Sequence, residues 1–366
     1  MHHLKWLFRF VNRNFIDSSA HRGRGYFIIA CLLLAILYYA YYYNVLEYIS
    51  TTPFAYFRYP LDVDMAAVVK KVLNNQNSGV DPLNDRYTYP YVLNCDKKCK
   101  DEEGSQDSVF LMILIKSRIE NFEQRHQIRR TWGREYGVAS VTVRRAFLLG
   151  VNPMDKTTQH RVGMEHQDYN DIVQQYFLDT YFNNTLKMMM GFQWATQYCE
   201  SARFIAFFDD DYFVNINSVI QLLQAVKPTE MDNLIIGYIW KNAMPLRIRD
   251  NKWYVSLEEY PFRFWPPYPT AGSFFVPMMT AEKLYVAMQY TKVIRFDDVF
   301  LGIVAWKLKT KLRHNSNLYF YDYPYDKYRY RRVIAAHGFS DPELLFKAWK
   351  EQTDMDKNAL KLANVN

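Results

Sequence analysis

The stretch Phe204-Ile-Ala-Phe-Phe-Asp-Asp-Asp211 decides the fold class. Its five apolar residues have the length of a strand buried on both faces. Three acids, Asp209, Asp210 and Asp211, follow the run directly. In open α/β sheets, ligands bind outside the carboxyl ends of the strands. The stretch therefore predicts a buried strand that ends in an acidic ligand site.

The flanking sequence has the same alternation of strand and helix patterns. Residues 109–115 are another apolar run of strand length, and Ser117-Arg-Ile-Glu120 has the capping-box pattern that predicts a helix start. Residues 184–199 predict a helix whose methionine stripe indicates core packing. Further apolar runs predict strands at 146–150, 204–208, 234–239, 253–256 and 273–276.

Strands that alternate with helices imply an α/β domain with a mainly parallel sheet. We assign this domain to residues 106–366, which are enough for a substantial core. Ser340-Asp-Pro-Glu343, with Pro342 near the first turn, predicts a late helix.

The three adjacent acids indicate a cation. Neighbouring carboxylates repel one another and raise each other's pKa values unless a positive charge neutralises them. Mg²⁺ and Mn²⁺ favour carboxylates and often bridge to substrate phosphates. The functional interpretation is a divalent metal site for a diphosphate. The alternative is an acidic turn in solvent.

Two further positions are candidates for chemistry. Asp297 and Asp298 precede an apolar segment, 299–308, that predicts a buried helix. An acid there is either a fixed general base or a cap that the helix dipole stabilises. His337 is either an imidazole metal ligand or a structural histidine.

The N-terminal region predicts a membrane anchor. No charged residue occurs from 25 to 46, which suffices for one crossing, and its tyrosines resemble an interfacial aromatic belt. Basic residues precede the run: Lys5, Arg9, Arg13, Arg22 and Arg24. The positive-inside rule therefore predicts a cytoplasmic tail (1–24), a signal-anchor (25–46), and a luminal or extracellular body. The alternative is a cleaved signal peptide.

Composition excludes several classes. With 49% hydrophobic and 23% charged residues, the chain is globular rather than disordered. The net charge is +7, and the basic N-terminus accounts for much of it, so nucleic-acid binding is not expected. Residues 47–105, with scattered prolines and one short predicted helix at 65–73, predict a luminal stem.

Two features fit a luminal body. Asn183-Asn-Thr185 is an N-glycosylation sequon at Asn183. Three cysteines lie beyond the anchor, so at most one intramolecular disulfide forms, and we favour Cys199 with Cys95 or Cys99. The alternative is three reduced, buried thiols.

The order of motifs resembles the β1,3-galactosyltransferase-like group of glycosyltransferase family 31 over residues 108–350. The matching elements are Leu114-Ile-Lys-Ser117, Arg125-His-Gln-Ile-Arg-Arg-Thr-Trp-Gly133, Glu165, Tyr169-Asn-Asp-Ile172, Phe177-Leu-Asp-Thr-Tyr181, Asn184-Thr-Leu-Lys187, the aspartate triplet, the acceptor-side block of Trp253-Tyr-Val-Ser256, Glu259-Tyr-Pro261 and Pro266-Pro-Tyr268, then Asp298-Val with Gly302, and His337.

The resemblance implies a GT-A type (Rossmann-like) fold and single-pass type II topology in the Golgi membrane. It implies an inverting β1,3-transfer from a UDP-sugar, with galactose the leading sugar and N-acetylgalactosamine or N-acetylglucosamine behind it. The partner is a glycan acceptor on glycoprotein or glycolipid. A homo-oligomer is compatible with the sequence.

The resemblance also implies residue roles. Asp209, Asp211 and His337 would hold Mn²⁺ or Mg²⁺, and Asp298 would be the catalytic base. Donor-binding residues would be Arg125, Arg129, Asp171, Lys187 and Asp210. Trp265 and Tyr268 would stack on the acceptor sugar, with core packing as the alternative.

The chain departs from the family pattern at Phe207-Phe208 before the triplet, at 269–275 after Pro-Pro-Tyr, and at Asp297, where the family has Glu. The competing hypothesis is an inactive, membrane-anchored glycan-binding protein of the same fold. A metal-dependent hydrolase is a third, disfavoured by the motif order.

Overall fold

The computed structural model describes residues 19–59, 63–84, 89–100, 108–138 and 141–363. They form two compact units: residues 58–243 with 265–366, and the chain up to 57 with 244–264. We call the first, which contains most of the predicted catalytic domain, the catalytic unit, and the second, which contains the predicted membrane helix, the membrane-proximal unit. The N-terminal lysine and arginines up to Arg13 lie outside the described residues.

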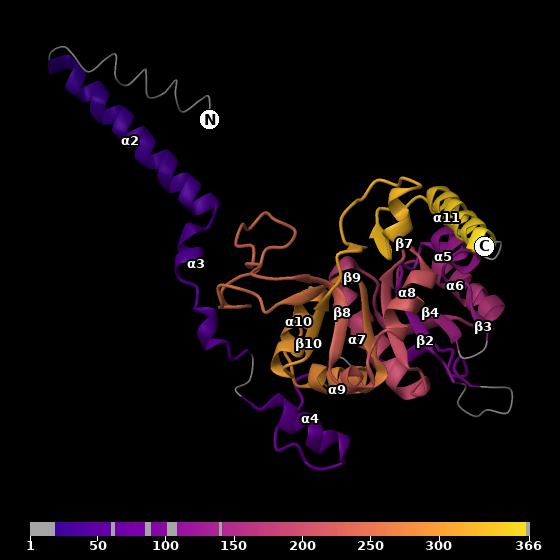
Figure 1. Cartoon of the computed structure of the whole chain (residues 1–366). Helices are drawn as coiled ribbons and strands as arrows, with labels where there is room; N and C mark the ends of the chain where they lie inside the picture. Colours follow the sequence, from indigo (N-terminus) through magenta and orange to yellow (C-terminus); the bar gives the residue numbers. More distant parts are fainter. Residues whose placement is uncertain (1–18, 60–62, 85–88, 101–107, 139–140, 364–366) are drawn as a thin grey trace. The chain divides into compact units, whose positions relative to one another are not determined.

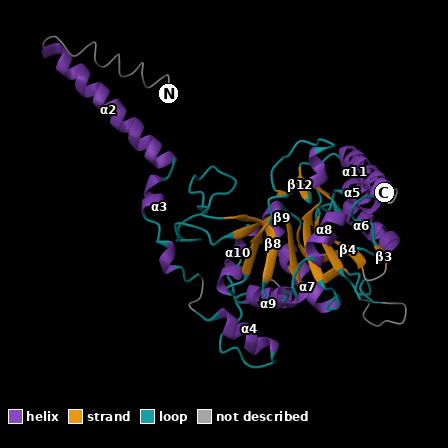
Figure 2. Cartoon of the chain, viewed as in Figure 1, coloured by secondary structure: helices purple, strands orange, loops and turns teal. Residues whose placement is uncertain are grey.

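The catalytic unit is built on one large sheet (Figures 1 and 2). The strand order is β1-β5-β4-β2-β6-β9-β8-β10, and β3 pairs with β4 off this path. The strands are β1 (Tyr91–Leu93), β2 (Leu111–Lys116), β3 (Tyr136–Val138), β4 (Val141–Val151), β5 (Ile172–Leu178), β6 (Phe204–Asp209), β8 (Leu234–Trp240), β9 (Tyr268–Pro277) and β10 (Lys311–His314).

The sheet is mixed. The central strands β5, β4, β2 and β6 are parallel, as is the pair β8 and β10. The pairs β1–β5, β3–β4, β6–β9 and β8–β9 are antiparallel. The predicted α/β class with a mainly parallel sheet is confirmed, since β5, β4, β2, β6, β8 and β10 run in one direction and β1, β3 and β9 run in the other.

Helices cover both faces of this sheet, because its central strands are apolar on both sides. On one face, Ile113 and Phe208 join a core cluster with Ile128 and Val219. On the other face, the Phe207 ring lies 4.9 Å from the Phe192 ring. The helices are α4 (Met65–Leu73), α5 (Phe122–Arg130), α6 (Lys156–Tyr169), α7 (Asn184–Tyr198), α8 (Ile216–Gln224), α9 (Met278–Gln289), α10 (Asp297–Lys307) and α11 (Pro342–Ala363).

Two local predictions from sequence are wrong. The helix expected at Ser117 begins at Phe122, because the Ser117 hydroxyl donates to Asp210 instead of capping a helix. Residues 253–256 form no strand; only an isolated bridge joins Leu246 and Tyr254. The other predicted helices and strands are present within a few residues of their predicted ends.

A second, three-stranded sheet consists of β11 (Leu318–Tyr319), β12 (Ala335–His337) and β7 (Tyr212–Val214) in the order β11-β12-β7. Strands β12 and β7 are antiparallel, and His337 is opposite Tyr212. Since β7 follows the aspartate triplet directly, this pairing brings the end of β12 to the triplet.

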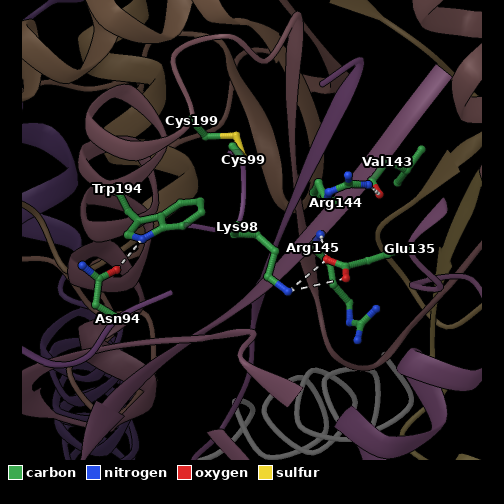
Figure 3. The surroundings of a disulfide bond; sticks show 9 residues. All are labelled: Asn94, Lys98, Cys99, Glu135, Val143, Arg144, Arg145, Trp194 and Cys199. Carbon is green, nitrogen blue, oxygen red and sulfur yellow. Dashed lines mark hydrogen bonds and ion pairs between the residues drawn. A yellow bond between two sulfur atoms is a disulfide. The ribbon is translucent and has the colours of Figure 1, made fainter. Parts of the chain in front are cut away.

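Much of the predicted stem belongs to the catalytic unit. Strand β1 pairs with β5, and a disulfide joins Cys99 to Cys199 (Figure 3). Near it, the indole of Trp194 donates to Asn94 over 2.8 Å. Of the two partners left open by the sequence, Cys99 is therefore the one bonded. Cys95 is a buried free thiol, and burial raises its pKa to about 12.

The membrane-proximal unit contains α2 (Ser19–Tyr42), which is long and apolar enough to cross a membrane between Gly25 and Tyr42. The predicted span extends to residue 46, but the helix ends earlier. Asn44 adopts left-handed backbone angles (φ 54°), and a short helix α3 (Val45–Ile49) follows it. Asn tolerates this conformation better than other side chains, so it separates the two helices.

Candidate active site

A buried lysine lies at the centre of the site. Strands β2 and β6 are parallel neighbours, and Lys116 is opposite Asp209 at their carboxyl ends. The Lys116 ammonium lies 2.9 Å from Asp209 Oδ1 and 2.5 Å from Asp297 Oδ2. Its side chain is only 2% exposed. One cation therefore joins the aspartate triplet to the first residue of α10.

Asp209 is strongly perturbed. Burial raises its pKa to about 6, although Lys116 acts to lower it, and the nearby carboxylates of Asp211 and Asp297 raise it further. Because Lys116 already occupies one oxygen of Asp209, Asp209 is less free than Asp211 to take up a metal ion.

Asp211 faces His337. The His337 Nε2 lies 3.1 Å from Asp211 Oδ2, and this hydrogen bond raises the histidine pKa. The other carboxylate oxygen, Oδ1, is buried without a hydrogen-bond partner. An orphaned carboxylate oxygen beside an imidazole fits a divalent cation, for which Mn²⁺ is a suitable choice.

The protein supplies few ligands for such an ion. Within the described ranges, no three or more His, Cys, Asp or Glu side chains are grouped closely enough to hold a metal by themselves. This fits a cation held by one or two protein groups and completed by substrate phosphate oxygens. The predicted set of Asp209, Asp211 and His337 thus separates into a lysine-paired carboxylate and an Asp211–His337 pair.

Asp210 lies in the lining of a polar cleft, as does Asp211. The Asp210 Oδ2 accepts hydrogen bonds from Ser117 Oγ (2.6 Å) and Asn121 Nδ2 (2.9 Å). The cleft has a volume of about 570 Å³, and its lining includes Arg118, Asn121, Phe122, Arg161, Asp210 and Asp211. The Arg161 guanidinium lies 4.1 Å from the Phe122 ring centre. The lining also contains Glu120 and Glu123, and Arg118 Nε lies 3.9 Å from Glu120 Oε2. The cleft therefore carries charges of both signs, and an anionic ligand there would need a bound cation as well as the arginines.

Asp298 lies at the amino end of α10, where its Oδ1 accepts from the Val299 N–H over 2.7 Å. Burial, together with the charge of Asp297, raises its pKa to about 7. A carboxylate with a pKa near neutrality is suited to act as a general base. The raised pKa of Asp298 is consistent with the expectation that this acid does more than cap the helix.

Burial raises the pKa of the Tyr268 phenol, and the charge of Asp298 raises it further. Close packing of α10 on the start of β9 depends on Gly302. A Cβ atom there would lie 2.4 Å from the Cβ of Tyr268 and 3.0 Å from the carbonyl oxygen of Pro267. Any other residue at this position would push the candidate base away from Tyr268.

The predicted donor-binding arginines lie in a buried ion network. Arg125 is fully buried and pairs with Glu165. Arg129 pairs with Glu165 and with Asp171, and Asp171 also pairs with Arg145. These groups are committed to one another. Arg125 also holds the turn before α5 by donating to the carbonyl oxygen of Arg118. The donor-binding roles of these residues stay predictions.

Lys187 has a similar role. Its ammonium donates to the carbonyl oxygen of Ser117 (2.6 Å) and pairs with Asp179 (2.7 Å). The side chain is almost completely buried and is not among the residues that line the cleft. Its bond to Ser117 fixes the chain directly after β2. Of the predicted donor residues, Asp210 alone is among the residues that line the cleft.

Two other predicted positions, Trp265 and Asn183, make contacts within the fold. Trp265 is 6% exposed, so its ring packs in the interior, in agreement with the alternative of core packing. Stacking of this ring on a sugar stays a prediction. In the sequon, the Asn183 amide donates to the carbonyl oxygen of Leu178, and Thr185 is buried with its hydroxyl bonded to Ile294. Glycosylation at Asn183 stays a prediction.

Sequence reasoning missed Lys116, Asn121, Arg118 and Arg161. Lys116 had a usable signal, since it is a charged residue at the end of an apolar run of strand length. No signal in the sequence indicated the role of Gly272. A Cβ there would lie 2.1 Å from the Tyr212 hydroxyl oxygen, and the Tyr212 ring packs against His337.

Comparisons with known proteins identify the family of the chain. The galactosyltransferase family profile matches residues 123–316. The chain is 36% identical to beta-1,3-galactosyltransferase brn of Drosophila melanogaster, over 91% of this chain and 98% of that protein. It is 32% identical to human lactosylceramide 1,3-N-acetyl-beta-D-glucosaminyltransferase over 82% of each, and 30% identical to mouse beta-1,3-galactosyltransferase 1 over 78% of this chain and 85% of that protein. The chain therefore belongs to the galactosyltransferase family and is a glycosyltransferase.

Proposed function

We propose that this chain is an inverting β1,3-glycosyltransferase that transfers a hexose or N-acetylhexosamine from a UDP-sugar to a glycan acceptor. The observation that carries the proposal is the Lys116 bridge. Lys116 pairs with Asp209, in the triplet that also contains the candidate metal ligand Asp211, and with Asp297, the neighbour of the candidate base Asp298, so the bridge joins the two segments that carry these residues.

The polar cleft is where we expect the nucleotide diphosphate. Arg118 and Arg161 lie in its lining, and Asp211 borders it. Asp211 and His337 would hold the divalent ion, with Mn²⁺ or Mg²⁺ as the candidates. When bound, this ion would neutralise the diphosphate and make UDP a better leaving group.

The protein groups then carry the transfer. Asp298 accepts the proton of the acceptor hydroxyl while that oxygen attacks the anomeric carbon. The bond from this carbon to the diphosphate oxygen breaks in the same displacement, so an α-linked donor gives a β-linked product. Tyr268, next to Asp298, orients the acceptor sugar against the base.

The proposed setting is the Golgi membrane. Helix α2 would serve as a type II signal-anchor, with the catalytic unit in the lumen. Two relatives are named as galactosyltransferases and one as an N-acetylglucosaminyltransferase, and we place galactose first for this chain. We expect no nucleic-acid partner.

A donor screen tests the proposal. The full chain in detergent is incubated with UDP-galactose, UDP-N-acetylgalactosamine or UDP-N-acetylglucosamine, with a panel of methyl glycosides, and with Mn²⁺ or EDTA. The proposal predicts acceptor-dependent, EDTA-sensitive UDP release from one donor. Folded protein that releases UDP equally with and without acceptor would instead be a hydrolase, and no release would favour the inactive binding protein.

A further inference from the structure

A short turn between β11 and β12 concentrates positive charge. Residues 327–332, Lys-Tyr-Arg-Tyr-Arg-Arg, hold four basic side chains and no acid, and we call them the basic turn. Of the net charge of +7, the first 25 residues supply +4 and the basic turn another +4, which leaves the remainder of the chain at −1. The basic turn is therefore a local feature of the catalytic unit and does not reflect a generally basic chain.

The basic turn is anchored to the core by its central tyrosine. Within the short 3₁₀ helix Arg329–Arg332, Tyr330 is fully buried. Its ring centre lies 5.4 Å from that of Phe213 and 5.9 Å from that of Phe339. The Tyr330 hydroxyl donates to the carbonyl oxygen of Tyr323. These contacts hold the middle of the turn against β7, the strand that contains Phe213.

Two hydrogen-bonding side chains fix the start of the turn. Asp326 Oδ1 accepts from the backbone N–H groups of Tyr328 (3.1 Å) and Arg329 (2.9 Å). From α11, the Gln352 amide donates to the carbonyl oxygen of Lys327 over 2.7 Å. Because the backbone is held at both places, a ligand that binds here orders side chains alone, and this lowers the entropic cost of binding.

The basic side chains reach solvent and lack acidic partners. All four are exposed: Lys327, Arg329, Arg331 and Arg332. The Arg329 guanidinium lies 5.4 Å from the Tyr323 ring centre. Across the part of the chain that the structure describes, no carboxylate is within ion-pair distance of the lysine or of the last two arginines. Exposed Lys311, by contrast, pairs with Glu230 over 2.7 Å. The basic turn therefore offers cations that the fold itself does not neutralise.

The residue types of the turn indicate a sulfated sugar chain as its ligand. A guanidinium presents a planar fork of N–H groups that binds the oxygens of sulfate or phosphate in pairs. Tyr328, between two of the cations, is 73% exposed, and an exposed aromatic face can pack on a sugar ring. Short segments this rich in lysine and arginine are typical of heparin-binding surfaces.

Two other polyanionic partners fit less well. The turn holds no aliphatic residue, whereas a segment that binds a membrane surface buries aliphatic or indole side chains beside its cations. A domain that binds nucleic acid is typically strongly basic as a whole. Outside the basic turn and the N-terminal tail, this chain has a net charge of −1.

We propose that the basic turn binds a sulfated polysaccharide of the heparin type, as a partner of the enzyme and not as the sugar acceptor. No residue of the turn is among those that line the polar cleft. His337, at the end of β12, follows Arg332 by five positions, which span at most about 18 Å. The bound polysaccharide therefore lies close to the candidate metal pair but contacts other residues.

Calorimetric titration of the full chain in detergent with a heparin octasaccharide tests the proposal, without sugar donor or metal and at several NaCl concentrations. The test variant carries Arg331→Gln with Arg332→Gln. The matched control carries Lys70→Gln with Lys71→Gln, an adjacent pair of exposed cations on α4. The basic N-terminal tail is the same in all chains, so a difference between the test and control variants is due to the turn.

We expect the test variant to bind the octasaccharide on the order of tenfold more weakly, because two exposed charge contacts are lost. The slope of log Kd against log salt concentration should fall by about 1–2, since each contact releases about one counterion. The control variant should bind as the unmodified chain does. Absence of binding by the unmodified chain, or an equal loss in the test and control variants, would overturn the proposal.

A second variant controls for damage to the fold. The pair Arg331→Lys with Arg332→Lys keeps both charges and should bind the octasaccharide more tightly than the glutamine pair does. Equal losses in the lysine and glutamine pairs would contradict the proposal, because they would indicate a distorted turn and not a lost charge contact.

The chemistry of the ligand is tested on the unmodified chain. Desulfated heparin, an oligonucleotide of equal charge and phosphatidylserine vesicles should each bind more weakly than the octasaccharide. Equal affinity for any of them would overturn the assignment to a sulfated sugar chain. Because no sugar donor is present, the result is independent of the proposed transferase function, and the two proposals fail separately.

Discussion

Lys116 and Asp209 form a buried ion pair, 2.9 Å apart, at the carboxyl ends of two adjacent parallel strands. The same ammonium pairs with Asp297, the residue before the candidate base. This single cation balances the charges of two carboxylates, and it acts to lower the pKa of Asp209, which burial raises. The stability, metal affinity and pH response of the site all follow from that arrangement.

Replacing Lys116 by Met should destabilise the fold by up to about 3–5 kcal/mol, because it leaves two partly buried carboxylates, 31% and 13% exposed, without their cation. Thermal melts of the full chain in detergent, followed by circular dichroism, measure the change. Lys311→Met is the matched control, since it removes a lysine that pairs with Glu230 at the surface and is 59% exposed. Equal melting temperatures for the two variants would contradict the role given to Lys116.

The two outer acids of the triplet should differ in metal binding. Asp211→Asn should abolish Mn²⁺-dependent UDP binding, because Asp211 Oδ1 is the orphaned oxygen beside His337. Asp209→Asn should weaken it less, since Lys116 already engages that carboxylate. Calorimetric titration of UDP in the presence and absence of Mn²⁺ measures both. The reverse order of effects would assign the metal to Asp209.

Activity should rise with pH through about 7. The pKa of Asp298 is raised to about 7, so below that pH its carboxyl is protonated and cannot accept the acceptor proton. The kcat/KM profile should gain tenfold per pH unit on its acidic limb and level off above pH 7. Since Lys116 lowers this pKa, Lys116→Met should move the limb to higher pH.

The stability that Asp298 contributes to the fold should fall as the pH rises, whereas the activity should increase. A carboxyl whose pKa is raised by folding stabilises the fold at low pH, and this contribution is lost as the pH rises through 7. Asp298→Asn should therefore raise the melting temperature more at pH 8 than at pH 5. Two results would mean that Asp298 is ionised throughout this pH range. One is a kcat/KM profile without an acidic limb, and the other is a gain in melting temperature for Asp298→Asn that is the same at pH 5 and pH 8.

The disulfide should contribute to stability through Cys99 and not Cys95. The bond closes a loop of 100 residues, and removing such a cross-link typically costs about 2–5 kcal/mol. Cys99→Ser should lower the melting temperature and abolish its sensitivity to dithiothreitol. Cys95→Ser should retain that sensitivity, because the Cys95 thiol is free. Retained sensitivity in Cys99→Ser would point to Cys95 as the bonded partner.

Sequence reasoning succeeded where a local pattern had one physical outcome. The apolar run before Asp209 forms the buried strand β6, and the acids emerge at its carboxyl end. Helix α4 has the bounds that its pattern predicted. Pro342 begins α11, although the capping oxygen comes from Asp341 and not from Ser340.

It was undecided where the outcome depended on distant partners. Arg129 and Asp171 lie in two separate motifs, and the sequence does not distinguish a donor contact from a buried ion pair. Trp265 has an aromatic ring suited to either a sugar or the core, and in the structure it packs in the interior. The antiparallel course of β9 and the packing of Glu47 on loop 244–264 leave no local signal, because they depend on how remote segments meet.

The most direct test of the central claim is proton NMR of the reaction product, made by the unmodified chain and by Asp298→Asn with the donor found in the screen. The account predicts a new β1,3 linkage from an α-linked donor, with the rate lowered about 10²–10⁴-fold in the variant while UDP–Mn²⁺ binding is kept. An α-linked product, or an Asp298→Asn variant with full activity, would contradict an inverting transfer that uses Asp298 as its base.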